Sequence, residues 1–207
     1  MQRPQVLSFC MASRGVLAVL TFTLVLILGG ADSAVGKQGR SPRSSNPSTP
    51  ELLAPDWTIV GLDGKMYNLK ALRGRVVVIN FWGSWCPPCR VELPHYQKFF
   101  QRYRNDQSLV ILSINEELSP DPRKRLSLAR NFALRYNLTF PVLPDMRGKV
   151  SKAYRVSSFP TIFVVDKDGF IRKRLEGYYA GVMEELQQVV EHLKHESQGN
   201  TAAKKAR

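Results

Sequence analysis

The feature that most constrains the fold is a buried strand pattern that ends at two closely spaced cysteines. Residues 75–82, RVVVINFW, form a nearly continuous apolar run rich in β-branched side chains, which is typical of a strand buried on both faces. A three-residue turn (83–85, GSW) then leads to CPPC at 86–89. Because proline is tolerated best in the first turn of a helix, a helix is expected from Cys86 to about Asn105. The pattern predicts a strand-to-helix junction with Cys86 at the helix cap and Cys89 in the first turn.

The rest of the chain alternates between strand and helix patterns. Short strands at 57–60 and 65–69 flank a Gly-Leu-Asp-Gly turn and are expected to form a hairpin. The later predictions are strands at 109–115 and 140–145, helices at 122–137 and 148–156, a hairpin at 161–177, and a closing helix from 181 to about 196. Strands separated by helices indicate an α/β protein with a mixed sheet covered on both faces.

The first 34 residues predict export. Arg3 and Arg14 precede an apolar run at 16–28, and small residues follow it, which is the pattern of a secretory signal peptide. Residues 15–31 are also long enough to remain as an N-terminal membrane anchor, so both readings stay open. Cys10 precedes the run and is expected to be lost or inert. Outside the cytoplasm the other two cysteines would meet an oxidising compartment.

Composition divides the remainder of the chain. Residues 35–50 are rich in Ser, Pro, Gly and Arg and are expected to be a flexible linker. The folded domain is expected at 51–196, and 197–207 is expected to be a disordered basic tail. The net charge of +13 predicts a basic surface that could lie on phospholipid head groups. No nucleic-acid-binding motif accompanies it, so nucleic acid is not an expected partner.

The helix start gives the two cysteines a chemical role. The N–H groups of a first helical turn have no intrahelical partners and favour negative charge, so a thiolate at Cys86 would be stabilised, with a pKa of about 3.5–7.5. The thiolate is the nucleophile that attacks a disulfide, and Cys89, expected to be the less exposed of the two, would resolve the mixed disulfide.

Three other readings of the cysteines are weaker. A structural disulfide that closes so short a loop would add little stability. A zinc site needs four ligands, and only His95, His192 and His195 could add to the cysteines. A peroxidase of the peroxiredoxin kind would have a threonine where Gly83 stands. No metal and no cofactor are therefore expected.

These motifs resemble a known family. WCPPC after a buried strand, RVELP at 90–94 and Phe-Pro-Thr at 159–161 look like the TlpA/ResA type of thiol-disulfide oxidoreductase, over roughly residues 55–193. The resemblance implies a thioredoxin fold in a redoxin, or AhpC/TSA-like, domain at 51–196. It also implies an N-terminal β-hairpin and a central helix–strand insertion, which the patterns at 122–145 match.

The resemblance also implies roles for individual residues. Cys86 matches the attacking cysteine, Cys89 the resolving cysteine, and Pro160 the cis-proline that faces the active site. The backbone of Phe159 would hold an extended substrate segment, although its side chain could equally fill the core. This chain departs from the family at 157–158, where two serines stand and many relatives carry a glycine.

Two further side chains belong to the expected site. Glu92 matches the family's acidic residue three positions after the resolving cysteine, and could relay the proton that Cys89 loses if burial raises its pKa. The alternative is an exposed glutamate paired with a basic neighbour. Trp85 is expected to shield the sulfurs and to form part of the docking surface, with plain packing as its alternative.

The implied function is an exported protein-disulfide reductase of the bacterial cell envelope, periplasmic or at the outer face of the inner membrane. Its expected partners are a membrane electron donor and disulfide-containing clients, such as apocytochrome c during cytochrome c maturation. An assembly factor or reductase for copper-site proteins is the alternative. A peroxidase or a disulfide-forming oxidant is less favoured, and the direction of exchange depends on the reduction potential.

Overall fold

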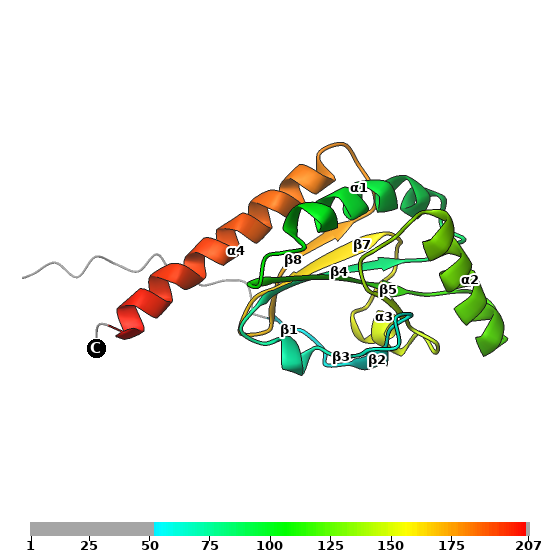
Figure 1. Ribbon diagram of the computed structural model, residues 1–207, viewed down its shortest axis with the longest axis horizontal. Coiled ribbons are helices and arrows are strands. Elements are labelled where there is room, and N and C mark those ends of the chain that lie inside the picture. The colour runs from blue at the N-terminus through cyan, green and yellow to red at the C-terminus, as the bar shows by residue number, and fades with distance from the viewer. Residues whose placement is uncertain (1–51, 206–207) are drawn as a thin grey trace, which may run out of the picture. The chain divides into compact units, whose positions relative to one another are not determined.

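The structure, a computed structural model, describes residues 52–205 and confirms the predicted α/β order (Figure 1). The expected signal or anchor at 1–34, the linker at 35–50 and Cys10 lie outside the described residues. The strands are β1 (Leu52–Leu53), β2 (Thr58–Val60), β3 (Met66–Asn68), β4 (Val76–Trp82), β5 (Leu109–Asn115), β6 (Val142–Pro144), β7 (Thr161–Val165) and β8 (Phe170–Glu176). The helices are the 3-10 turn η1 (Lys70–Leu72), α1 (Pro87–Tyr103), α2 (Pro122–Arg135), α3 (Lys149–Ala153) and α4 (Val182–Lys205).

A six-stranded mixed sheet has the order β1-β8-β7-β4-β5-β6. At its centre, β4 pairs in parallel with β5 and antiparallel with β7, and the β7-β8 hairpin was predicted. The β2-β3 hairpin predicted near the N-terminus forms a separate two-stranded sheet. The parallel register places Trp82 beside Asn115, so β4 and β5 end at the same edge. This edge carries the cysteines.

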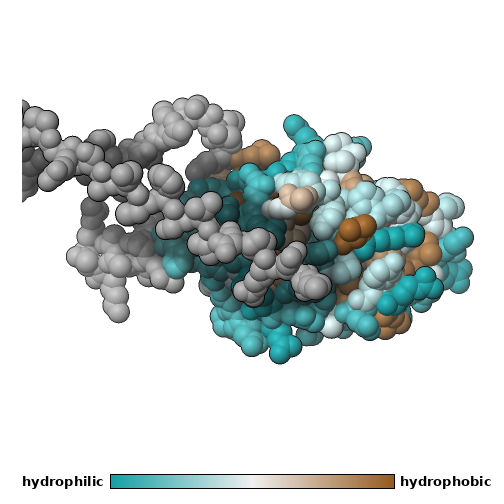
Figure 2. Space-filling view, turned by 90° about the horizontal axis from the view of Figure 1, so that it is seen from above, coloured by the Kyte–Doolittle hydropathy of each residue, from teal (hydrophilic) through white to brown (hydrophobic). Residues whose placement is uncertain are grey.

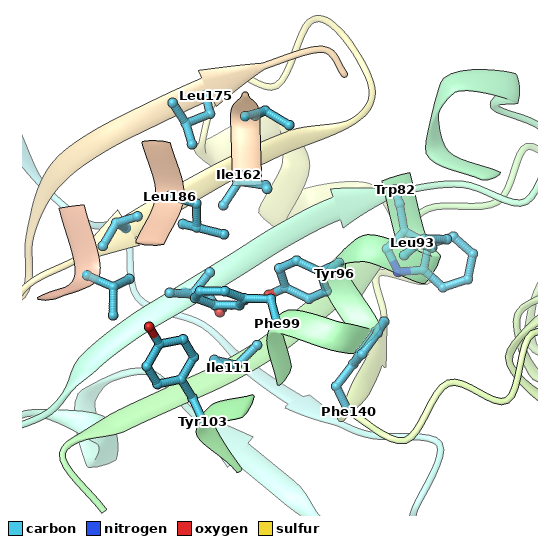
Figure 3. Packing of buried hydrophobic residues seen from close by; sticks show 14 of the residues in the cluster. Trp82, Leu93, Tyr96, Phe99, Tyr103, Ile111, Phe140, Ile162, Leu175 and Leu186 are labelled. Carbon is cyan, nitrogen blue, oxygen red and sulfur yellow. Dashed lines mark hydrogen bonds between the residues drawn. The ribbon is translucent and has the colours of Figure 1, made fainter. Parts of the chain in front are cut away.

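The sheet separates two cores, and Figure 1 shows α1 and α4 over one face. Val76 and Val78 of β4 belong to this first core together with Tyr96 of α1 and Leu186 of α4. Figure 3 shows the aromatic side chains of α1 packed among residues of the sheet and α4. The hydroxyl of Tyr96 donates to the carbonyl oxygen of Leu112 at 2.8 Å, which joins α1 to β5.

The second core lies on the opposite face, which α3 and the β2-β3 hairpin cover (Figure 1). Val77 and Ile79 of β4 point into it, where they join Trp57 and Tyr154. Because successive strand side chains face opposite sides, a strand between two cores must be apolar at nearly every position. This explains the continuous apolar run of β4, which is buried throughout.

Most of the predicted element boundaries differ from the structure by one to three residues, and the end of the closing helix differs by more. The closing helix was expected to end near Glu196 and to give way to an irregular tail, but α4 continues to Lys205. The added sequence contains no proline and ends in alanine and lysine, which are good helix formers, so nothing in it forces the helix to stop.

No helix in the described range 52–205 is long and apolar enough to cross a membrane. Figure 2 shows one face of the molecule, on which hydrophilic residues predominate and apolar residues form small separate patches.

Candidate active site

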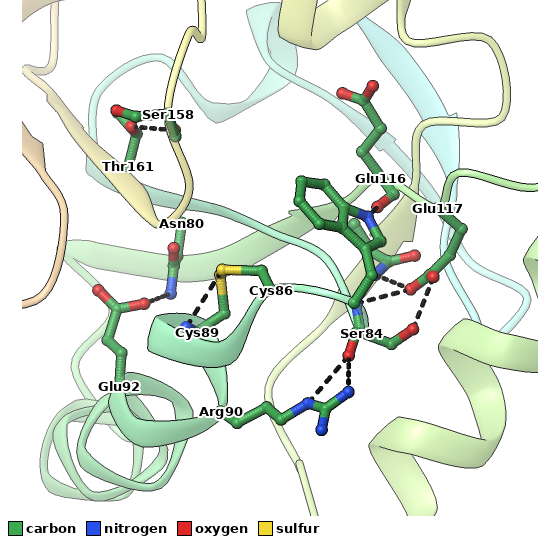
Figure 4. The surroundings of a disulfide bond; sticks show 12 residues. Asn80, Ser84, Cys86, Cys89, Arg90, Glu92, Glu116, Glu117, Ser158 and Thr161 are labelled. Atoms are coloured by element: carbon green, nitrogen blue, oxygen red, sulfur yellow. Dashed lines mark hydrogen bonds between the residues drawn. A yellow bond between two sulfur atoms is a disulfide. The ribbon is translucent and has the colours of Figure 1, made fainter.

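The two cysteines form a disulfide at the start of α1 (Figure 4). Cys86 is the N-cap residue, in an extended conformation, and its sulfur accepts a hydrogen bond from the backbone N–H of Cys89 at 3.2 Å. Pro87 and Pro88 occupy the first two helical positions, where no N–H is needed. The predicted cap is confirmed, and the first turn of α1 directs a donor at the sulfur of Cys86.

Both cysteines are buried in this oxidised form. Cys86 is 2% exposed and Cys89 is 0% exposed, so the expectation that Cys89 is the less accessible holds by a small margin. A partner's sulfur therefore reaches this pair only when neighbouring side chains shift.

Trp85 and Phe159, both predicted as part of the site, lie together. Their rings meet edge-on with centroids 5.4 Å apart, and the indole N–H of Trp85 donates to the carbonyl oxygen of Glu116 at 2.9 Å. A Cβ atom at Gly83 would lie 2.4 Å from the indole nitrogen, so only glycine leaves room for this indole position. The peptide bond between Phe159 and Pro160 is cis, as the family resemblance implied.

Phe159 serves the core as well as the site. Its half-buried side chain packs against the clusters on both sides of the sheet, so the alternative reading of this side chain as core filling holds alongside its contact with Trp85.

Glu92 lies inside the first turns of α1 and is fully buried. The side-chain amide of Asn80 donates to its Oε2 atom at 2.8 Å. Burial raises the pKa of Glu92 to about 8, because water no longer solvates the charged form, and the Asn80 hydrogen bond opposes this only in part. The alternative of an exposed glutamate paired with a basic neighbour is therefore wrong.

The Glu92–Asn80 pair also contains two oxygen atoms without a hydrogen-bond partner. Oε1 of Glu92 and Oδ1 of Asn80 are buried and have no hydrogen-bond partner among the described residues. Neither oxygen can donate a hydrogen bond while Glu92 is ionised, whereas a protonated Glu92 gains an O–H donor. This arrangement favours the protonated form of Glu92 in the oxidised protein.

Sequence reasoning missed the residues that hold the turn before Cys86. Glu117 accepts from the backbone N–H of Ser84 at 3.0 Å, from its hydroxyl at 2.7 Å, and from the side-chain amide of Asn115 at 2.9 Å. On the other side, Arg90 donates through Nε and Nη2 to the carbonyl oxygen of Ser84, at 3.1 and 2.8 Å (Figure 4). Every polar group of Ser84 thus has a charged partner.

A signal for these residues existed in the sequence. Glu117 directly follows the predicted strand at 109–115, and parallel neighbours end at the same edge of a sheet. Asn80 stood out as the single strongly polar residue of the run at 75–82 after its first arginine. Within the described part of the chain, no group of three or more His, Cys, Asp or Glu residues is placed to hold a metal ion.

Comparisons with known proteins agree with this geometry. The profile of the AhpC/TSA family matches residues 51–174. The thiol-disulfide oxidoreductase ResA of Bacillus cereus is 31% identical over 154 residues, which are 74% of this chain and 84% of that protein. ResA of Geobacillus thermodenitrificans is 35% identical over 141 residues, 68% of this chain and 76% of that protein.

A solved structure shows the same fold. The crystal structure of the exposed lipoprotein thioredoxin Etrx1 from Streptococcus pneumoniae superposes with a TM-score of 0.57 at 28% identity, and covers 67% of this chain and 100% of that one. The predicted thioredoxin fold, with its N-terminal hairpin and its helix–strand insertion (α2 and β6), is confirmed. The chain belongs to the AhpC/TSA family, as a thiol-disulfide oxidoreductase of the TlpA/ResA type.

Proposed function

We propose that the protein reduces disulfides of client proteins outside the cytoplasm, with Cys86 as nucleophile. In the reduced protein the Cys86 thiolate attacks one sulfur of the client disulfide, and the other client sulfur leaves as a thiolate that takes up a proton. Cys89 then attacks the sulfur of Cys86, which releases the second client thiolate. Two electrons pass to the client, and the domain ends with the Cys86–Cys89 disulfide.

One observation carries this assignment. The sulfur of Cys86 caps α1 and accepts the N–H of Cys89, so a helix N-terminus and a directed donor stabilise negative charge on this sulfur rather than on Cys89. Charge-assisted hydrogen bonds of this kind are stronger than neutral ones.

Glu92 supplies the proton transfer that resolution needs. Cys89 must lose its proton before it attacks, and Glu92 stands three residues further along the same helix. An acid whose pKa lies near the working pH exchanges protons readily, and burial brings Glu92 into that range. Glu92 is thus the general base that accepts the proton of Cys89.

The client binds beside Trp85 and the cis-proline. An extended client segment pairs with the backbone of Phe159, next to Pro160, in the manner of an added strand. The Trp85–Phe159 ring contact forms an aromatic surface at the same place. The half-exposed indole of Trp85 contributes apolar contact area for the client.

The cellular setting follows from the leader and the relatives. The signal-like pattern at 1–34 supports a location in the cell envelope, and the name of Etrx1 describes that similar protein as an exposed lipoprotein. In an oxidising compartment a reductase needs a membrane electron donor to regenerate its dithiol. The client we propose is apocytochrome c, whose haem-binding cysteines must be reduced before haem is attached.

Trapping experiments test the order of attack. Cys89→Ser should accumulate a mixed disulfide between Cys86 and the client, because the resolving thiol is missing. Cys86→Ser, the matched control, should accumulate none. Adducts are counted by non-reducing electrophoresis and located by mass spectrometry. Equal adducts from both variants would contradict the assignment of Cys86 as nucleophile.

A further inference from the structure

A hollow of about 440 Å³ lies next to the turn at 83–85 that precedes Cys86, here called the redox turn. Ser84 and Arg90, next to the cysteines in the sequence, line it together with residues of α2 that include Asn131 and Arg135. The space is far larger than the roughly 30 Å³ of a water molecule, so it has room for amino-acid side chains rather than for one small ion.

The floor of this hollow is apolar and fixed. Phe132 and Tyr136, both of α2, stack with ring centroids 4.2 Å apart and an interplanar angle of 15°. Phe132 also meets the ring of Trp82, at the end of β4, at 5.0 Å. Because Trp82 is fully buried, the floor is anchored in the core of the domain and does not depend on a mobile loop.

The rim of the hollow is cationic. Two guanidinium groups, Arg90 and Arg135, line it, and no acidic side chain does. Neither arginine forms a salt bridge within the part of the chain whose side chains are described. Arg90 is held in place, because its Nε and Nη2 atoms donate to the carbonyl oxygen of Ser84. Its Nη1 group is left for another acceptor.

The composition of α2 adds positive charge beside the hollow. The helix contains five arginine or lysine residues and no aspartate or glutamate between Pro122 and Arg135. A position in the last turn suits a cation through the helix dipole, which accounts for the charge at Arg135 but not for the second guanidinium, Arg90, which lines the same hollow. An apolar floor with a cationic rim complements a peptide that carries a carboxylate beside apolar side chains.

We propose that this hollow, together with its arginines, binds an acidic segment of the client that flanks the cysteine under attack. The inference rests on the proposed reduction of client disulfides and names the client class that the site prefers. Ser84 lies two residues before Cys86 and Arg90 directly follows Cys89, so a segment in the hollow is adjacent to the reacting sulfurs. Binding there brings the client disulfide to the site in one orientation.

A pair of matched substrates tests the proposal. Two synthetic peptides, identical except for Glu or Gln next to a single cysteine, are each linked through a disulfide to uncharged 2-mercaptoethanol. The reduced full-length protein should release the Glu peptide about two to five times faster than the Gln peptide at low ionic strength, the range expected of one exposed ion pair. Salt at about 0.5 M should remove most of this preference.

Two variants of one helix separate local recognition from overall charge. Arg135→Gln should bring the Glu/Gln rate ratio close to one, and Arg135→Lys should retain part of the preference. Arg130→Gln is the matched control, because Arg130 lies on α2, is exposed, and lines a different hollow. It should leave the ratio unchanged. Since the readout is a ratio, a general change in reactivity of a variant cancels.

The outcomes distinguish this inference from the proposed function. Equal rates for both peptides with the unmodified protein would overturn the inference alone. An equal loss of preference in Arg130→Gln and Arg135→Gln would overturn it too, since the whole basic surface would then be responsible. Reduction of neither peptide would overturn the proposed function and this inference with it.

Discussion

At the scale of single residues, two acidic groups at the start of α1 lie in opposite surroundings. The sulfur of Cys86 receives a backbone N–H at the start of α1, and this donor would favour a thiolate there once the disulfide is reduced. The carboxyl group of Glu92 is buried, beside an amide that donates only one hydrogen bond to it, which favours its neutral form. Groups whose surroundings favour opposite charge states are suited to divide nucleophilic attack and proton transfer between them.

Glu92 makes the stability of the oxidised protein depend on pH. Its pKa rises from 4.5 to about 8 in the folded chain, so between these values the folded state holds a proton that the unfolded state has lost. The free energy of unfolding should fall by roughly 1.4 kcal/mol for each pH unit across this window and level off above it.

Glu92→Gln should remove this slope, because the neutral amide keeps an acceptor for Asn80 and has no proton to lose. The variant should be the more stable protein at pH 8 by about 3 kcal/mol or more, with little difference near pH 4.5. Urea unfolding of both oxidised proteins at several pH values measures this. Parallel pH profiles would show that Glu92 ionises normally in the folded state.

Single residues were predictable where a short motif carried them. Cys86 as a helix cap followed from the prolines after it, and the cis bond at Pro160 from the family resemblance. The clamp on Ser84 was not predictable, since Glu117 lies 33 residues away and meets it only through the register of β4 and β5. The burial of Glu92 likewise depends on which face of α1 meets the sheet.

At the scale of elements, the strand patterns translated into structure more directly than the helix ends. The run at 75–82 gave β4 almost residue for residue, because a strand between two cores is apolar at every position but Asn80 and its limits are therefore sharp. The end of α4 was misjudged, since no proline stops the helix after Glu196 and weak propensities decide the boundary.

The closing helix is fastened to the end of α1 by an ion pair. Lys194 of α4 contacts the carboxylate of Asp106 at 2.8 Å, just after α1. Asp106 also accepts from the N–H and hydroxyl of Ser108. The hydrogen bond from Lys194 lowers the pKa of Asp106 to about 2, with a further contribution from Ser108. This stabilisation is present above the ordinary pKa of 3.8 and is lost as the pH falls through about 2.

Asp106→Asn should lower the free energy of unfolding by about 1 kcal/mol at pH 7, because the group is partly solvated and its ion pair is screened. The difference from the unmodified protein should shrink as the pH falls from about 4 toward 2. Asp168→Asn is the control, at an exposed carboxylate outside the ion pairs of the described side chains. The midpoints of urea unfolding of the two variants and the unmodified protein at pH 7, 4 and 2.5 measure these differences. An equal effect at every pH would contradict the ion-pair account.

At the scale of the whole molecule, the fold brings three distant parts of the chain to one edge of the sheet. The redox turn follows β4, the supporting Glu116-Glu117 pair follows β5, and the cis-proline precedes β7. Since β7 runs antiparallel to β4, its beginning meets the end of β4. The inserted helix α2 follows the Glu116-Glu117 segment and adds a cationic wall. The family resemblance predicted the insertion, but not the hollow that it forms with the turn.

The most direct test of the account is the pKa of the Cys86 thiol in the reduced protein. The rate of alkylation by iodoacetamide is followed against pH, and peptide mapping by mass spectrometry separates Cys86 from Cys89 and Cys10. The account predicts a pKa of about 3.5–7.5, well below the roughly 8.5 of a free cysteine. A Cys86 that titrates at about 8.5 or above would contradict it, since the start of α1 would then not stabilise the thiolate.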